Sequence, residues 1–222
     1  MFFLFFCFFL ESDLFLCFFL SFFLCSPNNP TGNSFSDESV VYLLQNFKGL
    51  VVIDEAYIDF SNKESWINEL DEYPNLVITQ TLSKAYGLAG IRLGICYAST
   101  GVISVLNKIK PPYNVNELSQ KRALERLADT DKISAEIASI IRQREDLLEV
   151  LLHVEFVKKI YPTEANFILV KVDDANKRYA ELIAKGMPLI QLNNFCDEIK
   201  NFENAEVNQE LFDKAFGEGN VT

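Results

Sequence analysis

The sequence has very little histidine and lacks the paired cysteines of common metal sites. His153 is the single histidine among 222 residues, and none of the five cysteines belongs to a Cys-x-x-Cys motif. A zinc site and a Ser-His-Asp triad therefore have little basis in this composition, and we interpret His153 as a structural residue. The cysteines are odd in number and three of them lie in the first 25 residues, which indicates no disulfide framework.

Basic residues are also scarce, since the formal net charge is −11 at pH 7. The first basic residue is Lys48 and the last arginine is Arg178. A nucleic-acid partner would require a basic face, so we expect no nucleic acid to bind. A chain of this length holds one large or two small domains.

Residues 1–25 form an apolar segment that differs from the rest of the chain. They contain eleven Phe, six Leu and three Cys, in two apolar runs separated by Glu11-Ser12-Asp13. Three interpretations are open, in order of preference: a translated pyrimidine-rich stretch that was never selected as protein, a membrane anchor, and a signal peptide. An anchor would place Asp13 near the bilayer centre at a cost of roughly 2.5–3.5 kcal/mol. A signal peptide would need a basic start.

Alternating strand and helix patterns follow and predict an α/β fold with a mainly parallel sheet. Apolar runs at residues 50–54, 76–79 and 93–98 indicate strands, and Ser36 is the expected N-cap of a helix that Gly49 ends. From about residue 101 the pattern is mostly helical. The helices expected across the chain lie at residues 36–48, 66–70, 102–109, 116–127, 133–152 and 177–185, and residues 166–170 are β-rich.

The stretch from residue 79 to 94 carries the strongest chemical signal. Lys84 follows a strand and lies between the hydroxyls of Thr81 and Ser83 and the guanidinium of Arg92. A lysine amine forms a Schiff base with a carbonyl compound, and hydroxyls together with a guanidinium hold a phosphate. The stretch therefore suits a carbonyl compound that carries a phosphate. The plain alternative is a surface lysine in a loop.

Two further motifs precede this stretch. Residues 51–57 are an apolar run that ends in Asp-Glu-Ala-Tyr, as a buried parallel strand with function at its carboxyl end would. Residues 26–32, Ser-Pro-Asn-Asn-Pro-Thr-Gly, are a dense turn signal. In this order and spacing, N-N-P-T-G, D-E-A-Y and S-K-A-Y-G-L-A-G-I-R-L-G resemble the class I and II aminotransferases of pyridoxal-phosphate fold type I, most closely the histidinol-phosphate aminotransferase branch. The resemblance covers about residues 25–186.

The resemblance implies catalytic and cofactor-binding roles. Lys84 would be the catalytic lysine, which binds the cofactor pyridoxal 5'-phosphate and shuttles a proton. Asp54 would keep the pyridine nitrogen protonated. Tyr57 and Asn29 would both contact the phenolic oxygen, and the Asn29–Pro30 bond is a candidate cis peptide.

The cofactor phosphate would be bound by Thr81, Ser83 and Arg92, according to the same resemblance. Asn166 resembles an asparagine of the family's small domain and is held as a weaker candidate. Glu55 is expected to be structural. No metal is expected.

The resemblance also implies how the chain is divided. Residues 26–115 would be part of the large, pyridoxal-phosphate-binding domain of fold type I. Residues 116–192 would be the linker helix and part of a small α/β C-terminal domain, and residues 193–222 an acidic tail. Neither the upstream half of the family nor its arginine for the substrate carboxylate has a counterpart here. We therefore expect this chain alone to transaminate poorly or not at all.

The implied function is transamination between histidinol phosphate and 2-oxoglutarate, in histidine biosynthesis. The partners would be a small-molecule amino donor and a 2-oxo acid, in a cytoplasmic homodimer. One alternative is another class I/II aminotransferase or a related pyridoxal-phosphate enzyme. A second alternative is an inactive fragment, attached to a membrane through residues 1–25.

Overall fold

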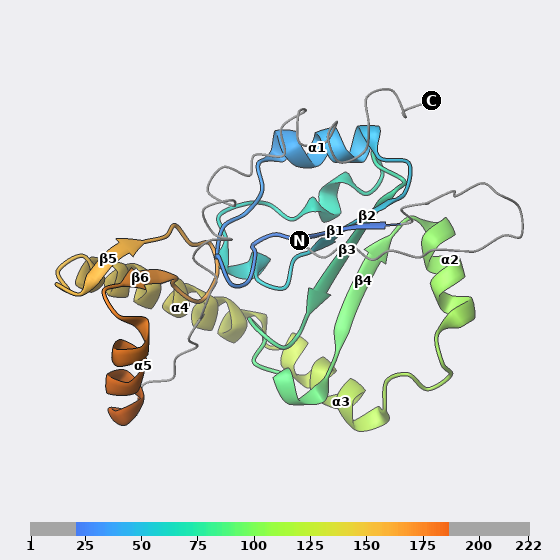
Figure 1. Cartoon of the computed structure of the whole chain (residues 1–222). Helices are drawn as coiled ribbons and strands as arrows, with labels where there is room; N and C mark the ends of the chain where they lie inside the picture. The colour runs from blue at the N-terminus through green and yellow to red at the C-terminus, as the bar shows by residue number, and fades with distance from the viewer. Residues whose placement is uncertain (1–20, 187–222) are drawn as a thin grey trace, which may run out of the picture.

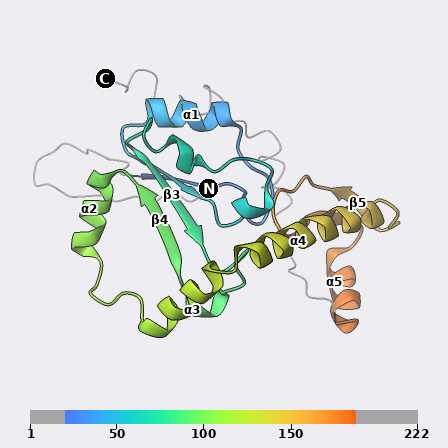
Figure 2. The same cartoon turned by 180° about the vertical axis from the view of Figure 1, so that it is seen from behind.

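The computed structural model describes residues 21–186, which form two sheets and five α-helices within that range (Figures 1 and 2). The larger sheet and its helices come first in the chain, and a smaller unit that begins with the long helix α4 follows. With η for a 3₁₀ helix, the elements are β1 (Ser21–Cys25), α1 (Asp37–Asn46), β2 (Leu50–Asp54), η1 (Ile58–Phe60), η2 (Trp66–Glu69), β3 (Leu76–Thr81), η3 (Ala89–Ile91), β4 (Gly94–Ala98), α2 (Thr100–Ile109), α3 (Glu117–Leu127), α4 (Thr130–Leu151), β5 (Val157–Ile160), β6 (Val170–Val172) and α5 (Ala175–Ala184).

The larger sheet has the strand order β1-β2-β3-β4. β1, β2 and β3 are parallel, and β4 pairs with β3 in the antiparallel direction. The central strand β2 is almost entirely buried, as is usual for a parallel strand covered on both faces. This arrangement confirms the predicted α/β fold with a mainly parallel sheet. The direction of β4 could not be predicted, because side-chain alternation is the same in both directions.

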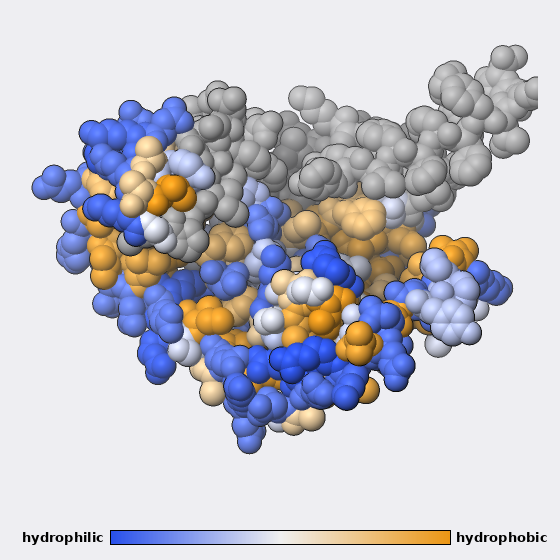
Figure 3. Space-filling model, turned by 90° about the horizontal axis from the view of Figure 1, so that it is seen from below, coloured by the Kyte–Doolittle hydropathy of each residue, from blue (hydrophilic) through white to orange (hydrophobic). Residues whose placement is uncertain are grey.

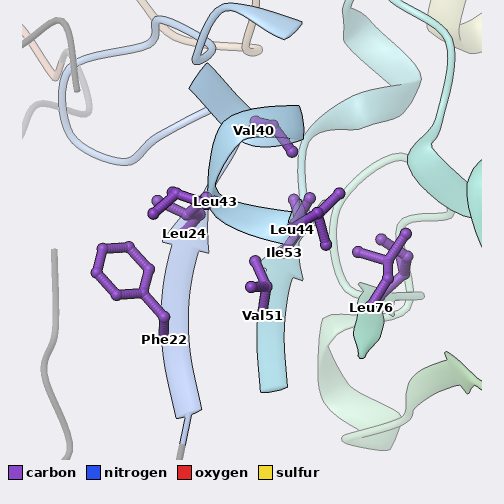
Figure 4. Close-up of a cluster of buried hydrophobic side chains, with 9 residues drawn as sticks. Phe22, Leu24, Val40, Leu43, Leu44, Val51, Ile53 and Leu76 are labelled. Carbon is purple, nitrogen blue, oxygen red and sulfur yellow. The ribbon is translucent and has the colours of Figure 1, made fainter. Parts of the chain in front are cut away.

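Helix α1 covers one face of this sheet and forms the main core with it (Figure 4). Ser36 caps the helix as predicted, and its side chain accepts a hydrogen bond from the backbone N–H of Ser39. Successive strand residues point to opposite faces, so every second residue faces α1. The buried side chains of this core are Phe22, Leu24, Val40, Leu43, Leu44, Val51, Ile53, Leu76 and Ile78.

The first strand corrects the boundary that we expected at residue 25. The composition groups residues 21–25 with the apolar segment 1–25, but Ser21–Cys25 forms β1 and pairs with β2 over its whole length. Phe22 and Leu24 are buried against α1, so these residues belong to the sheet. The strand was hidden because its composition continues that of the preceding Phe/Leu-rich run. Residues 1–20, and the part of the small domain and tail expected beyond residue 186, lie outside the described residues.

The smaller unit consists of the β5–β6 pair with α4 and α5. The β-rich stretch expected at residues 166–170 is strand only from Val170 onward, since β6 is Val170–Val172 and pairs with β5. The preceding residues are held in a turn instead: Thr163 Oγ1 donates to the carbonyl of Phe167 at 2.7 Å, and Ala165 is fully buried. Strand β5 was not predicted, because two of its four residues are lysines.

Helices α2 and α3 leave apolar side chains in contact with solvent. The large hydrophobic residues that are exposed on these helices and their connection are Val105, Leu106, Ile109, Tyr113, Leu118, Leu124 and Leu127. Figure 3, a view from below, shows orange apolar patches among blue polar ones. Within residues 21–186 no helix is both long and apolar enough to cross a bilayer.

Candidate active site

The carboxyl ends of the three parallel strands bring three polar or reactive side chains into one row. Cys25, Asp54 and Thr79 are register partners on β1, β2 and β3. Each directly follows a core residue that faces α1. Because successive side chains of a strand point to opposite faces, all three lie on the sheet face opposite α1. Asp54 also accepts a hydrogen bond from the N–H of Ala56 at 3.2 Å, which fixes the start of the loop after β2.

Cys25 and Thr79 were not predicted as site residues. Burial raises the pKa of the Cys25 thiol, and the neighbouring Asp54 carboxylate raises it further, so the thiol stays protonated at neutral pH. The signal that could have found them is strand register, which a single sequence does not reveal for residues about 25 positions apart.

Asn29 and Tyr57 form a direct hydrogen bond between the first two loops. Asn29 Nδ2 donates to Tyr57 Oη at 2.7 Å. The Asn29–Pro30 peptide bond is cis, as expected. The Tyr57 ring is buried and packs edge-on against Phe167, with 5.3 Å between ring centroids. The two polar groups expected to meet the same cofactor oxygen therefore do lie together.

Lys84 projects from a tight turn that follows β3. Leu82, Ala85 and Leu88 are buried and anchor the turn, whereas Lys84 is exposed. Its ammonium nitrogen Nζ lies 5.2 Å from the centroid of the Tyr57 ring. Cation and ring face attract at this distance, which directs the amine toward the Asn29–Tyr57 pair.

Thr81 and Ser83 form a hydroxyl pair at the end of β3. Thr81 Oγ1 donates to Ser83 Oγ at 2.9 Å, and the Ser83 N–H donates back to Thr81 Oγ1 at 3.1 Å. Thr81 pairs with Gly94 of β4, so the chain brings Arg92 to the same end of the sheet. Arg92 is exposed, has a left-handed backbone with φ of 55°, and donates from Nη1 to the Ala89 carbonyl at 3.1 Å.

Glu55 is the structural residue that we expected. It is 1% exposed, and its carboxylate accepts hydrogen bonds from the Ser65 hydroxyl, the Trp66 N–H and the Gln80 amide. Asn166, the weaker candidate, is exposed next to the buried Ala165. His153 is exposed in the turn after α4.

One hollow in the described part of the chain lies away from these residues. It measures about 520 Å³ and is lined by Ala98 of β4 and by residues of α2. Ala98 pairs with Val77, near the amino end of β3, whereas Gly94 pairs with Thr81 at its carboxyl end. The hollow therefore lies at the opposite end of strands β3 and β4 from Lys84, and we do not include it in the site. In residues 21–186, no cluster of three or more His, Cys, Asp or Glu is arranged to hold a metal ion.

Asp59, beside the site in η1, carries a charge that the fold disfavours. Burial raises the pKa of its carboxyl, and the Glu55 charge adds to the effect. A raised pKa in the folded state means that stability is greatest below the unfolded pKa and is lost as pH rises through the folded pKa. The ionised Asp59 therefore costs stability at pH 7.

Replacing Asp59 by asparagine is expected to raise the melting temperature at pH 7 by about 1–2 °C, a modest effect because the side chain is partly exposed. The gain should shrink toward zero near pH 3, where the carboxyl of the parent is protonated too. Thermal melts of both proteins across that pH range measure it. A constant difference at all pH values would contradict the assignment.

Comparison with known proteins places the chain in a family. The family model for aminotransferase class I and II matches residues 20–197, a range wider at both ends than the resemblance seen in the sequence. A histidinol-phosphate aminotransferase of Flavobacterium johnsoniae is 75% identical over 197 residues, covering 85% of this chain and 56% of the relative. One from Flavobacterium psychrophilum is 58% identical over 172 residues, covering 78% and 49%.

Solved structures agree with this placement. The histidinol-phosphate aminotransferase of Clostridium acetobutylicum superposes with a TM-score of 0.69 at 26% identity, covering 75% of this chain and 52% of that one. The Sinorhizobium meliloti enzyme in complex with pyridoxal-5'-phosphate gives a TM-score of 0.64 at 28% identity, covering 75% and 45%. The chain belongs to the class I and II aminotransferases, with the fold of pyridoxal-phosphate enzymes of type I. It spans about half the length of the curated relatives it matches.

Pyridoxal phosphate is the cofactor of this family, and the donor set in this chain fits it. The exposed amine of Lys84 lies 5.2 Å from the centroid of the Tyr57 ring, and the Tyr57 hydroxyl accepts a hydrogen bond from the Asn29 amide. The carboxylate of Asp54 ends the neighbouring strand β2, the hydroxyls of Thr81 and Ser83 lie at the end of β3, and Arg92 comes just before Gly94, the partner of Thr81. Amine, carboxylate and anion-binding groups match an aldehyde, a pyridine nitrogen and a phosphate.

Proposed function

We propose that this chain carries the lysine-bearing part of the active site of a histidinol-phosphate aminotransferase. The reaction would move the amino group of histidinol phosphate to 2-oxoglutarate, in histidine biosynthesis. The observation that carries the proposal is the convergence of Asn29, Tyr57 and Lys84 from three strand ends. The names of the relatives at 75% and 58% identity support this substrate and do not favour another aminotransferase or a decarboxylase.

Each residue has a defined task in this proposal. When bound, pyridoxal phosphate supplies an electron sink for the bonds of the substrate α-carbon. Lys84 Nζ anchors the cofactor and then serves as the base that takes and returns a proton, which requires its neutral form.

The remaining residues hold and orient. Asp54 keeps a proton on the ring nitrogen, since a carboxylate next to that nitrogen favours its charged form. Asn29 and Tyr57 direct hydrogen bonds to the phenolic oxygen. The phosphate is held by the paired hydroxyls of Thr81 and Ser83 and by the guanidinium of Arg92.

We also propose the partners that the family suggests. These are an amino donor, a 2-oxo acid and a second copy of the protein, in the cytoplasm. The support is the family membership and the names of the relatives.

The test is covalent labelling of the 222-residue chain. The chain is incubated with pyridoxal phosphate, reduced with borohydride, digested and mapped by mass spectrometry. We expect the label on Lys84 in preference to the other lysines, at micromolar cofactor. Label spread over exposed lysines, with Lys84 unmodified, would overturn the proposal.

A further inference from the structure

The turn between β5 and β6, residues 163–167, is fastened to both loops that carry the Asn29–Tyr57 pair. The Glu164 N–H donates to the Gly32 carbonyl at 2.7 Å. Glu164 Oε2 accepts hydrogen bonds from the hydroxyl of Ser34, at 2.9 Å, and from that of Ser61. Gly32 and Ser34 follow Asn29, and Ser61 follows Tyr57, so one carboxylate joins the two loops.

Two more contacts hold the same turn against the loop after β2. Arg144 of α4 is 9% exposed, and its Nη1 donates to the carbonyls of Phe60 at 3.0 Å and Ala165 at 2.9 Å. Phe167 braces the Tyr57 ring from its edge. The turn is thus a fixed support behind Tyr57, and Glu164 is the member that also reaches the Asn29 loop.

The Asn29 loop itself is closed mainly by bonds within it. Asn28 N–H donates to the Asn33 carbonyl at 2.8 Å, and the Gly32 N–H donates to the Asn28 carbonyl at 2.7 Å. These bonds set the shape of the loop but not its distance from Tyr57. Gly32 packs so closely on the support that a Cβ there would lie 2.6 Å from Thr163 Oγ1. The start of the loop is held to the end of β2 by the Ser26 N–H, which donates to the Asp54 carbonyl at 3.0 Å, and its far end is held by residues 163–167 through Gly32 and Ser34.

We propose that Glu164 is a positioning residue of the cofactor site: it fixes the far end of the Asn29 loop against the loop that carries Tyr57 and so aligns both side chains toward one oxygen of the cofactor. The identity of that oxygen, the phenolic oxygen of pyridoxal phosphate, rests on the proposed function. A carboxylate that accepts hydrogen bonds from two hydroxyls holds the two loops together more strongly than a neutral acceptor would, because hydrogen bonds to a charged group are stronger. Displacements of about 1 Å in such supports are enough to weaken a site.

The first readout needs no cofactor. The chain is labelled with 3-fluorotyrosine, and the Tyr57 signal in the ¹⁹F NMR spectrum is assigned with a Tyr57→Phe variant. We expect Glu164→Ala to shift or split the Tyr57 signal, because the Tyr57 hydroxyl would no longer have the Asn29 amide held in a fixed position as its donor. Glu149→Ala, which removes an exposed carboxylate from α4, is the matched control and should leave the signal in place.

The second readout uses pyridoxal phosphate as the probe. Glu164→Ala should bind it about 10-fold more weakly than the parent. The absorbance change of the bound cofactor with pH should move to higher pH, since a phenolic oxygen with fewer donors favours the protonated chromophore. Glu164→Gln keeps the shape and one acceptor and should recover part of both effects.

The outcomes separate this proposal from the proposed function. The positioning role would be overturned if Glu164→Ala left the Tyr57 signal unchanged and bound pyridoxal phosphate as tightly as the control Glu149→Ala does. If the parent chain binds no pyridoxal phosphate, the proposed function fails, while the Tyr57 signal still decides whether Glu164 aligns the pair. Should Glu164→Ala not fold, Ser34→Ala and Ser61→Ala each remove one hydroxyl and must then shift the signal in smaller steps.

Discussion

Replacing Lys84 by alanine is expected to abolish borohydride-stable labelling by pyridoxal phosphate and to reduce amino transfer by about 10⁴-fold. In the proposed function one amine serves both as the anchor of the cofactor and as the proton-transfer base, and a positioned base alone contributes up to about 10⁴. Transfer is measured in a chimera in which residues 21–186 replace the aligned stretch of the Flavobacterium johnsoniae relative. High identity over this stretch makes the replacement conservative.

Two variants show whether the loss belongs to the amine at this position. Lys84→Arg keeps the positive charge beside the Tyr57 ring but supplies no primary amine, so it should be as inactive as the alanine variant. Lys121→Ala removes an exposed lysine of α3 and should change neither readout. Transfer within tenfold of the parent in Lys84→Ala would show that another group is the base.

The local part of this site was predictable because its residues are close in sequence. Thr81, Ser83 and Lys84 lie within four positions at the end of one strand, so the strand pattern and turn already place them together. Arg92 follows by one short connection, and the pairing of β3 with β4 returns it to Thr81. The roles of these residues remain predictions, while their proximity is a feature of the fold.

The distant part of the site was predictable only in outline. Asn29 and Tyr57 are 28 positions apart, and their proximity was expected from the resemblance and not from any local pattern. The bond from Ser61 to Glu164 spans 103 positions, and Glu164 lies just before the β-rich stretch expected at residues 166–170. Such contacts depend on tertiary packing, for which one sequence carries no periodic signal.

Glu55 and Asp54 illustrate how neighbouring carboxylates in one motif take different tasks. Alternation along β2 sends them to opposite faces, Asp54 to the row with Cys25 and Thr79, and Glu55 to the face toward η2. Asp54 remains partly accessible, whereas Glu55 is almost wholly buried with its oxygens occupied. The accessible carboxylate is available to a ligand, and the buried one is committed to the protein.

Replacing Glu55 by alanine is therefore expected to destabilise the fold by about 3 kcal/mol. The change leaves three donors without their acceptor, from Ser65 at 2.6 Å, the Trp66 N–H at 2.8 Å and Gln80 at 2.9 Å. Each buried donor left unsatisfied costs about 1–3 kcal/mol, less where water enters the space. The single tryptophan, Trp66, lies at this contact and reports urea unfolding by its fluorescence.

The variants Glu55→Gln and Glu72→Ala separate the contribution of the buried carboxylate from that of a surface charge. Glutamine keeps the shape but presents an amide N–H₂ to donors, so it should cost roughly half as much, about 1–2 kcal/mol. Glu72 is exposed, and its loss should stay within about 0.5 kcal/mol. Because Glu55 faces away from Lys84, folded Glu55→Gln protein should still take the pyridoxal-phosphate label on Lys84. Loss of that label without loss of stability would instead assign Glu55 to the site.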